Sequence, residues 1–128
     1  MKRLLAAALV ALTLCGAAAS QGDVKTAPKK QFVYVLKLTP RLLDEKNWTE
    51  QDRQIVGRHF RRLQQMQKVG RLILAGKTLD DADPGQFGVV IFEADSEEEA
   101  RKVLEADDAV SEKIMTARLF PFSVALAR

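Results

Sequence analysis

The stretch Ile55–Gly76, IVGRHFRRLQQMQKVGRLILAG, decides the fold of this chain. Its apolar residues recur at spacings of three and four, the period of one face of an α-helix, and arginines and glutamines take the opposite face. Gly70 is placed to end that helix, and Arg71–Lys77 then has the pattern of a strand. His59, the only histidine in the chain, falls among the apolar positions. We therefore expect an amphipathic helix packed on a sheet, with the imidazole directed inward.

The residues before this helix predict a strand, a loop and a helix cap. The segment 31–38, QFVYVLKL, alternates as a strand does, and both of its faces are apolar over most of its length. Residues 39–48 have no sustained period and predict a loop, in which Trp48 is a core anchor or, as the alternative, a lid. Thr49 followed by Asp52 resembles a helix N-cap with an acidic first turn.

The residues after it predict a turn, a strand and a second helix. Residues 78–87 form a turn-rich acidic connection, and residues 88–94, GVVIFEA, predict a strand that is apolar on both faces. Ser96 begins the next helix, and Glu99 three positions later suggests a capping box. Ala100, Val103 and Leu104 make one apolar stripe of this helix. Asp107 falls at the next step of that stripe, so we expect it to face inward as well.

The last predicted element is a strand over residues 116–126, TARLFPFSVAL, in which Pro121 is best tolerated at the edge of a sheet. The element order is then β-α-β-β-α-β. The right-handed crossover rule folds this order into a ferredoxin-like α+β domain with both helices on one face of an antiparallel sheet. Because two strands are apolar on both faces, we expect a second copy to cover the other face, which makes the assembly a homodimeric α+β barrel.

Residues 1–20 have the three parts of a secretory signal peptide. Two basic residues are followed by the apolar run Leu4–Leu14 and then by small residues, with cleavage expected near Ala19 or Ser20. The apolar run is shorter than the roughly 20 residues of a membrane span. We therefore expect a secreted or periplasmic protein with no stable membrane insertion after cleavage. Leu14 is bulky where a lipid-attachment site usually has a small residue, so we expect no lipid anchor at Cys15.

Removal of that segment leaves a flexible lead-in, residues 21–30, and one domain, residues 31–128. The remaining chain loses two of its 20 basic residues and none of its 17 acidic ones, so its formal charge falls from +3 to +1. A near-neutral domain gives no electrostatic support for a nucleic-acid partner. The only cysteine is also lost, which excludes disulfides, cysteine metal sites and a cysteine nucleophile.

His59 and Asp107 are the candidate site residues. In the expected topology the two helices run antiparallel, so the front of the first lies near the end of the second and the two side chains could meet. A carboxylate beside an imidazole fixes the tautomer of the ring and stabilises its charged form, which equips it as a general acid or base. The alternative is that both residues are only packed in the core or at a helix end. We expect no metal and no cofactor.

These segments resemble the YciI-like, or YCII-related domain, family. The resemblance rests on HFRRLQQMQKVGRLILAG from His59, FGVVIFEADSEEEA from Phe87, ADDAV around Asp107 and the final TARLFPFSVAL. It implies a ferredoxin-like dimeric α+β barrel and an active site built on His59 and Asp107. The family usually has proline directly after the aspartate, whereas this chain has Asp108, so Asp107 and Asp108 are alternative partners of the histidine.

The resemblance also implies a class of chemistry. Activities in the neighbourhood of the family include cofactor-independent reactions of small cyclic or phenolic compounds, such as elimination of chloride from a hydroxylated aromatic. We therefore expect a small organic molecule as substrate, with proton transfer, elimination or isomerisation at His59. The alternative function is a non-catalytic module that binds a small ligand through the same fold.

Overall fold

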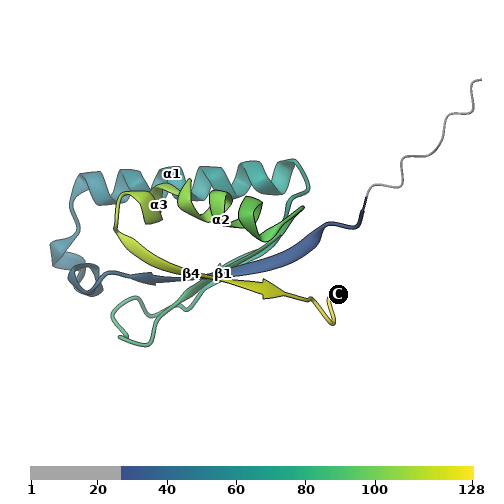
Figure 1. Ribbon diagram of the computed structural model, residues 1–128. Coiled ribbons are helices and arrows are strands. Elements are labelled where there is room, and N and C mark those ends of the chain that lie inside the picture. Colours follow the sequence, from purple (N-terminus) through teal and green to yellow (C-terminus); the bar gives the residue numbers. More distant parts are fainter. Residues whose placement is uncertain (1–26) are drawn as a thin grey trace, which may run out of the picture.

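A computed structural model of the chain describes residues 27–128. It consists of one four-stranded antiparallel sheet with its α-helices packed on a single face (Figure 1). The predicted signal peptide and most of the predicted lead-in lie outside the described residues. Among residues 27–128, no helix is long and apolar enough to cross a bilayer.

The predicted order of the main elements is confirmed. The strands and helices are β1 (Lys30–Leu38), α1 (Glu50–Lys68), β2 (Leu72–Lys77), β3 (Gly88–Ala94), α2 (Glu97–Glu105), α3 (Asp108–Ser111) and β4 (Met115–Phe122). The strands lie in the order β2-β3-β1-β4, with β1 in the centre beside both β3 and β4. This is the α+β, ferredoxin-like arrangement that the sequence predicts. Pro121 lies in β4, an edge strand, where its missing N–H is tolerated.

The long helix α1 has a well-defined start and end. The Thr49 side chain accepts from the Asp52 N–H at 3.1 Å, and the Asp52 carboxylate accepts from the Thr49 N–H at 2.8 Å, which completes a capping box. At the other end Gly70 has a φ of 73°, the left-handed conformation in which glycine carries no side-chain penalty. Its N–H and that of Arg71 donate to Gln67 and Met66, which satisfies the last carbonyls of the helix.

Three local predictions are wrong in detail. The predicted loop 39–48 contains two short 3₁₀ turns, η1 (Pro40–Leu43) and η2 (Glu45–Asn47). The predicted capping box of α2 is incomplete, because Glu99 accepts from the Asp95 N–H at 2.9 Å instead of from Ser96. The last strand ends at Phe122 and not at residue 126. Its last pair is Phe122 with Gln31, and beyond it the Val124 N–H donates to the Gln31 side chain at 2.7 Å instead of to the backbone of β1.

The core lies between the sheet and the helices. Its main cluster joins the inward residues of β1 and β3 to α1 and α2, and consists of Phe32, Tyr34, Leu36, Leu63, Met66, Val90, Phe92, Ala94, Ala100, Val103 and Leu104. A smaller cluster at the start of α1 consists of Leu42, Ile55, Ala109 and Ile114. The helix α3 packs against α1 between these clusters. Residues of β1, α1 and α3 that are distant in sequence are thereby brought to one place.

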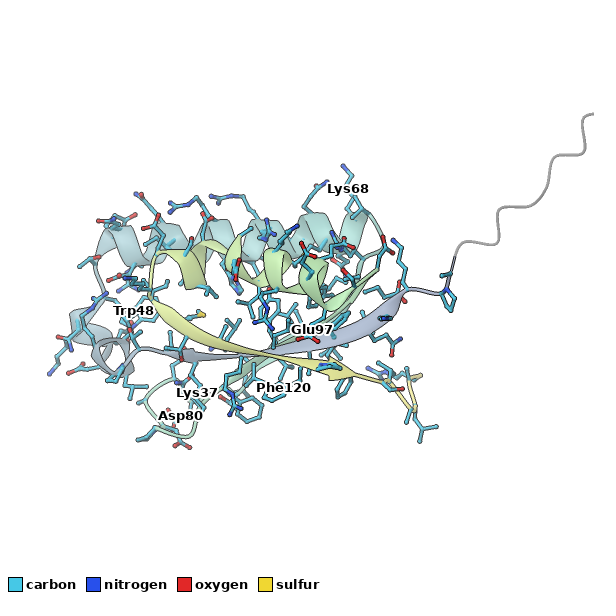
Figure 2. All side chains as sticks on the ribbon, viewed as in Figure 1. Lys37, Trp48, Lys68, Asp80, Glu97 and Phe120 are labelled. Atoms are coloured by element: carbon cyan, nitrogen blue, oxygen red, sulfur yellow. The ribbon has the colours of Figure 1, made fainter. Side chains whose placement is uncertain are left out.

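The opposite face of the sheet is apolar and uncovered by helices. Registry places Val33, Val35 and Phe120 on this face, and Phe120 is 37% exposed. Figure 2 shows Phe120 and Lys37 projecting from the sheet on the side away from the helices. The predicted difference between the two faces of the sheet is therefore present, with helices on one face and an apolar surface on the other.

Candidate active site

His59 and Asp107 are in direct contact in the interior. The imidazole Nδ1 lies 2.8 Å from both carboxylate oxygens of Asp107. His59 comes from the inward stripe of α1 and is 9% exposed, while Asp107 is fully buried. The contact that the sequence predicts between the two side chains is present.

Asp107 belongs to a different helix from the one predicted. The helix α2 ends at Glu105, and Asp107 is the N-cap of α3 instead of the last step of the α2 stripe. Its carboxylate accepts from the Ala109 N–H at 3.0 Å, so the start of α3 holds the side chain in one orientation. The prediction failed because a helix of one turn carries too few residues to show a period.

Tyr34 is a third member of the cluster and was not predicted. Its hydroxyl donates to Asp107 Oδ2 at 2.9 Å, and the side chain is fully buried in the centre of β1. In the sequence it is one of several large side chains on the inward face of a strand. The polar partner lies 73 residues further along the chain, so strand alternation gives no signal of the contact.

The structure also decides between the two adjacent aspartates. Asp108 turns away from His59 and pairs with Arg58 near the surface, where its side chain is 36% exposed. Asp107, and not Asp108, is the carboxylate that contacts the imidazole. An exposed pair such as Arg58 with Asp108 contributes little to stability.

The hydrogen bonds around Asp107 favour its anionic form. Burial by itself would raise the pKa of Asp107, but the hydrogen bond and charge of His59, together with the donors of Tyr34 and Ala109, lower that pKa below its usual range. Burial and the Asp107 charge raise the pKa of the Tyr34 hydroxyl, which keeps it a donor. An anionic Asp107 requires a proton on His59 Nδ1. The imidazole therefore has Nε2 as its second, free position.

A cavity of about 380 Å³ lies beside His59. It opens between α1 and the ends of β2 and β3, and its walls are mostly apolar, formed by residues including Leu36, Leu38, Trp48, Val56, Phe60, Leu63, Phe87, Val90 and Met115. No residue of 27–128 hydrogen-bonds to His59 Nε2, and the His59 side chain is part of the cavity lining. A cavity of about 150 Å³ holds a benzene ring, so this one has room for a substituted ring.

Trp48 has features of both predicted roles. Its indole N–H donates to the Leu42 carbonyl at 2.8 Å, and its ring packs against the smaller core cluster, as the anchor interpretation predicts. Trp48 also lines the cavity. Within residues 27–128, no three acidic or histidine side chains gather closely enough to hold a metal ion.

Replacing Tyr34 by phenylalanine is expected to lower the free energy of unfolding by about 1–3 kcal/mol, because a hydrogen bond to a buried anion is lost. The ring remains, so packing against Phe92 is unchanged. Urea denaturation of wild type and variant measures the difference. Equal midpoints and slopes would show that the hydroxyl does not stabilise Asp107.

Acidification is expected to destabilise the fold. The hydrogen bonds from Arg41 and Thr49 lower the pKa of Asp52, and those around Asp107 lower the pKa of that carboxyl. A carboxyl whose pKa is lowered by folding contributes stability above its unfolded value of about 3.9, and the contribution is lost as the pH falls through the folded value. Melting temperatures between pH 7 and pH 2.5 should therefore fall below about pH 4. The Asp52→Asn variant should show a shallower fall, and an identical profile would contradict this account.

Comparison with known proteins supports the fold described above. The model of the YCII-related domain matches residues 31–123. The chain belongs to the YCII-related domain family. No curated protein sequence matches it. Among solved structures, this YCII-related chain is similar to the 5-chloro-2-hydroxyhydroquinone dehydrochlorinase of Burkholderia phenoliruptrix AC1100 in complex with 2,5-dihydroxybenzoquinone. The two share 19% identity with a TM-score of 0.56, over 73% of this chain and 93% of the other, so the likeness is one of fold.

Proposed function

We propose that this YCII-related protein is an enzyme that moves protons on a small hydroxylated cyclic compound, with His59 as general acid and base and Asp107 as its orienting carboxylate. The observation that carries the proposal is the geometry of the imidazole. Asp107 holds Nδ1 at 2.8 Å, and the free Nε2 belongs to a ring that lines an apolar cavity. This is the arrangement that general base catalysis requires.

The chemistry follows from the free nitrogen. Nε2 accepts the proton of a ring hydroxyl, and the resulting imidazolium is stabilised by the buried Asp107 anion. The imidazolium then returns the proton to a ring carbon, which gives the keto tautomer. If that carbon carries chlorine, chloride leaves with its bonding pair and a second hydroxyl loses its proton. The net change is isomerisation or loss of HCl, and neither requires an electron acceptor.

The class of substrate is supported by two observations. The cavity has room for one substituted ring and mostly apolar walls. The structural neighbour described above is a dehydrochlorinase that was solved with a dihydroxybenzoquinone. We extend that class of substrate, small hydroxylated rings, to this chain.

A ligand screen tests the proposal. Small phenols, chlorinated hydroxyhydroquinones, cyclic acids and lactones are mixed with wild type and with the His59→Asn variant. Thermal shift reports binding, and chromatography and chloride release report consumption. The proposal predicts at least one compound that stabilises wild type and is consumed only by it. Equal stabilisation of both proteins with no consumption would identify a binding module instead.

We also propose that the protein acts outside the cytoplasm, because residues 1–20 have the pattern of a signal peptide. Expression of the whole chain and of a chain that starts at residue 21, followed by cell fractionation, tests this. Only the whole chain should reach the periplasm or medium. Equal distribution of the two chains would contradict export.

A homodimer is the assembly we propose. The uncovered sheet face carries the apolar side chains of Leu74, Phe120 and Phe122, which are 49%, 37% and 42% exposed, and a face of this kind is usually covered in a stable assembly. Sedimentation equilibrium should give twice the monomer mass for wild type. A lysine in place of Val35 should shift the protein to monomer, and a monomeric wild type would contradict the assembly.

A further inference from the structure

The cavity beside His59 has a second buried polar side chain, Gln86. This residue belongs to the connection between β2 and β3, yet it is only 5% exposed and lines the same cavity as His59. The two charged side chains of the lining, Lys77 and Asp81, are about half exposed and pair with each other at 2.7 Å. Gln86 and His59 are thus the buried polar side chains of this lining.

One end of the Gln86 amide is fixed by β1. The Leu38 N–H, at the end of that strand, donates to Gln86 Oε1 over 3.5 Å. The strand β3 begins at Gly88, which is paired with Leu36, so β3 has no residue in register opposite Leu38. Because a backbone N–H requires an acceptor, this contact also decides which end of the amide is oxygen and which is nitrogen.

The other end of the amide is a donor that lacks an acceptor. Within residues 27–128, no oxygen accepts a hydrogen bond from Gln86 Nε2. This nitrogen is open to solvent, because Arg62 Nε is the one buried side-chain polar atom of residues 27–128 that lacks a partner. Gln86 Nε2 can therefore donate to water or to a molecule that enters the cavity. Since the walls of the cavity are mostly apolar, an oxygen of a bound molecule that displaces this water is a suitable acceptor.

We propose that Gln86 is a specificity-determining residue, which donates a hydrogen bond from Nε2 to an acceptor oxygen of the bound molecule. The inference rests on the proposed function, in which His59 takes the hydroxyl proton of the same molecule. The two residues together select a hydroxylated aromatic ring that also carries a carbonyl or similar oxygen on another position. The hydroxyl meets His59, and the second oxygen meets Gln86.

Two matched phenols test this selection. 4-Hydroxyphenylacetone and 4-isobutylphenol have hydroxyls of similar acidity and nearly the same size, because the carbonyl of the first is not conjugated with the ring, and only the first has a carbonyl oxygen. Calorimetric titration of wild type at pH 8 should give tighter binding of the ketone by about tenfold, the scale of one hydrogen bond. Equal affinities would overturn the role of Gln86.

Variants separate this inference from the proposed function. Gln86→Glu keeps an oxygen for the Leu38 N–H but replaces the donor by an acceptor, so the preference for the ketone should disappear. Gln86→Met removes the donor without adding charge and gives the same test if the glutamate variant does not fold. A preference retained in either folded variant overturns the inference. His59→Asn should weaken both phenols alike, and failure of wild type to bind either phenol would overturn both proposals.

Discussion

Replacement of His59 by asparagine is expected to lower the rate of the reaction by about 10²–10⁴-fold, the usual contribution of a general acid or base. Asparagine places an amide nitrogen near the position of the imidazole Nδ1, so Asp107 keeps a donor in place of the one now at 2.8 Å. What the variant loses is Nε2, the atom that would exchange a proton with the substrate. Steady-state rates with the compound found in the ligand screen measure the effect.

A second substitution at the same position serves as the control. His59→Gln places an amide near the position of Nε2, where it can form a hydrogen bond but cannot accept a proton. This variant should bind the compound more tightly than His59→Asn and should be just as slow. Wild-type rates in either folded variant would show that His59 has no part in the chemistry.

Replacement of Asp107 by asparagine is expected to affect both rate and stability. The carboxylate accepts hydrogen bonds from Tyr34, His59 and Ala109, and an amide has only one oxygen to offer them. At least one buried donor then loses its acceptor, which costs about 1–3 kcal/mol in the free energy of unfolding. The tautomer of the imidazole is also no longer fixed, so we expect a rate loss of at least 10²-fold.

The next residue offers a matched control for this prediction. Asp108→Asn makes the same chemical change one position further along, where the carboxylate pairs with Arg58 at the surface. It should change the free energy of unfolding by less than about 1 kcal/mol and leave the rate unaltered. Equal effects of the two substitutions, measured by urea denaturation and steady-state rates, would contradict the assignment of Asp107 as the partner of His59.

Most of the fold follows from periodic patterns in the sequence. The spacing of apolar residues in α1 and the alternation in β1 and β3 are long enough to predict each element and its buried face. The short helix α3 and the two 3₁₀ turns were missed because one turn has no period to detect. The end of β4 was misplaced because it depends on how far the pairing with β1 extends, and the local pattern of one strand does not include its partner.

The candidate site could be predicted only where a residue interrupts a periodic pattern. His59 is conspicuous as a polar residue on an apolar stripe, and Asp107 was chosen because it is near the end of another stripe. Tyr34 and Gln86 gave no such signal, since each looks like an ordinary residue of a strand or a turn. Their importance depends on contacts with Asp107 and Leu38, which lie 73 and 48 residues away in the chain.

Nitrogen NMR of the imidazole tests directly whether Asp107 fixes the tautomer of His59, because His59 is the only histidine in the chain and a tag-free protein gives one unambiguous pair of signals. At pH 8.5, we expect a protonated Nδ1 and an unprotonated Nε2 in the free protein. On titration with a phenol that keeps its hydroxyl proton at this pH, such as 4-ethylphenol, the Nε2 signal should move toward its protonated position while Nδ1 stays protonated. An unprotonated Nδ1, or an Nε2 signal that no compound of the ligand screen moves, would contradict this expectation.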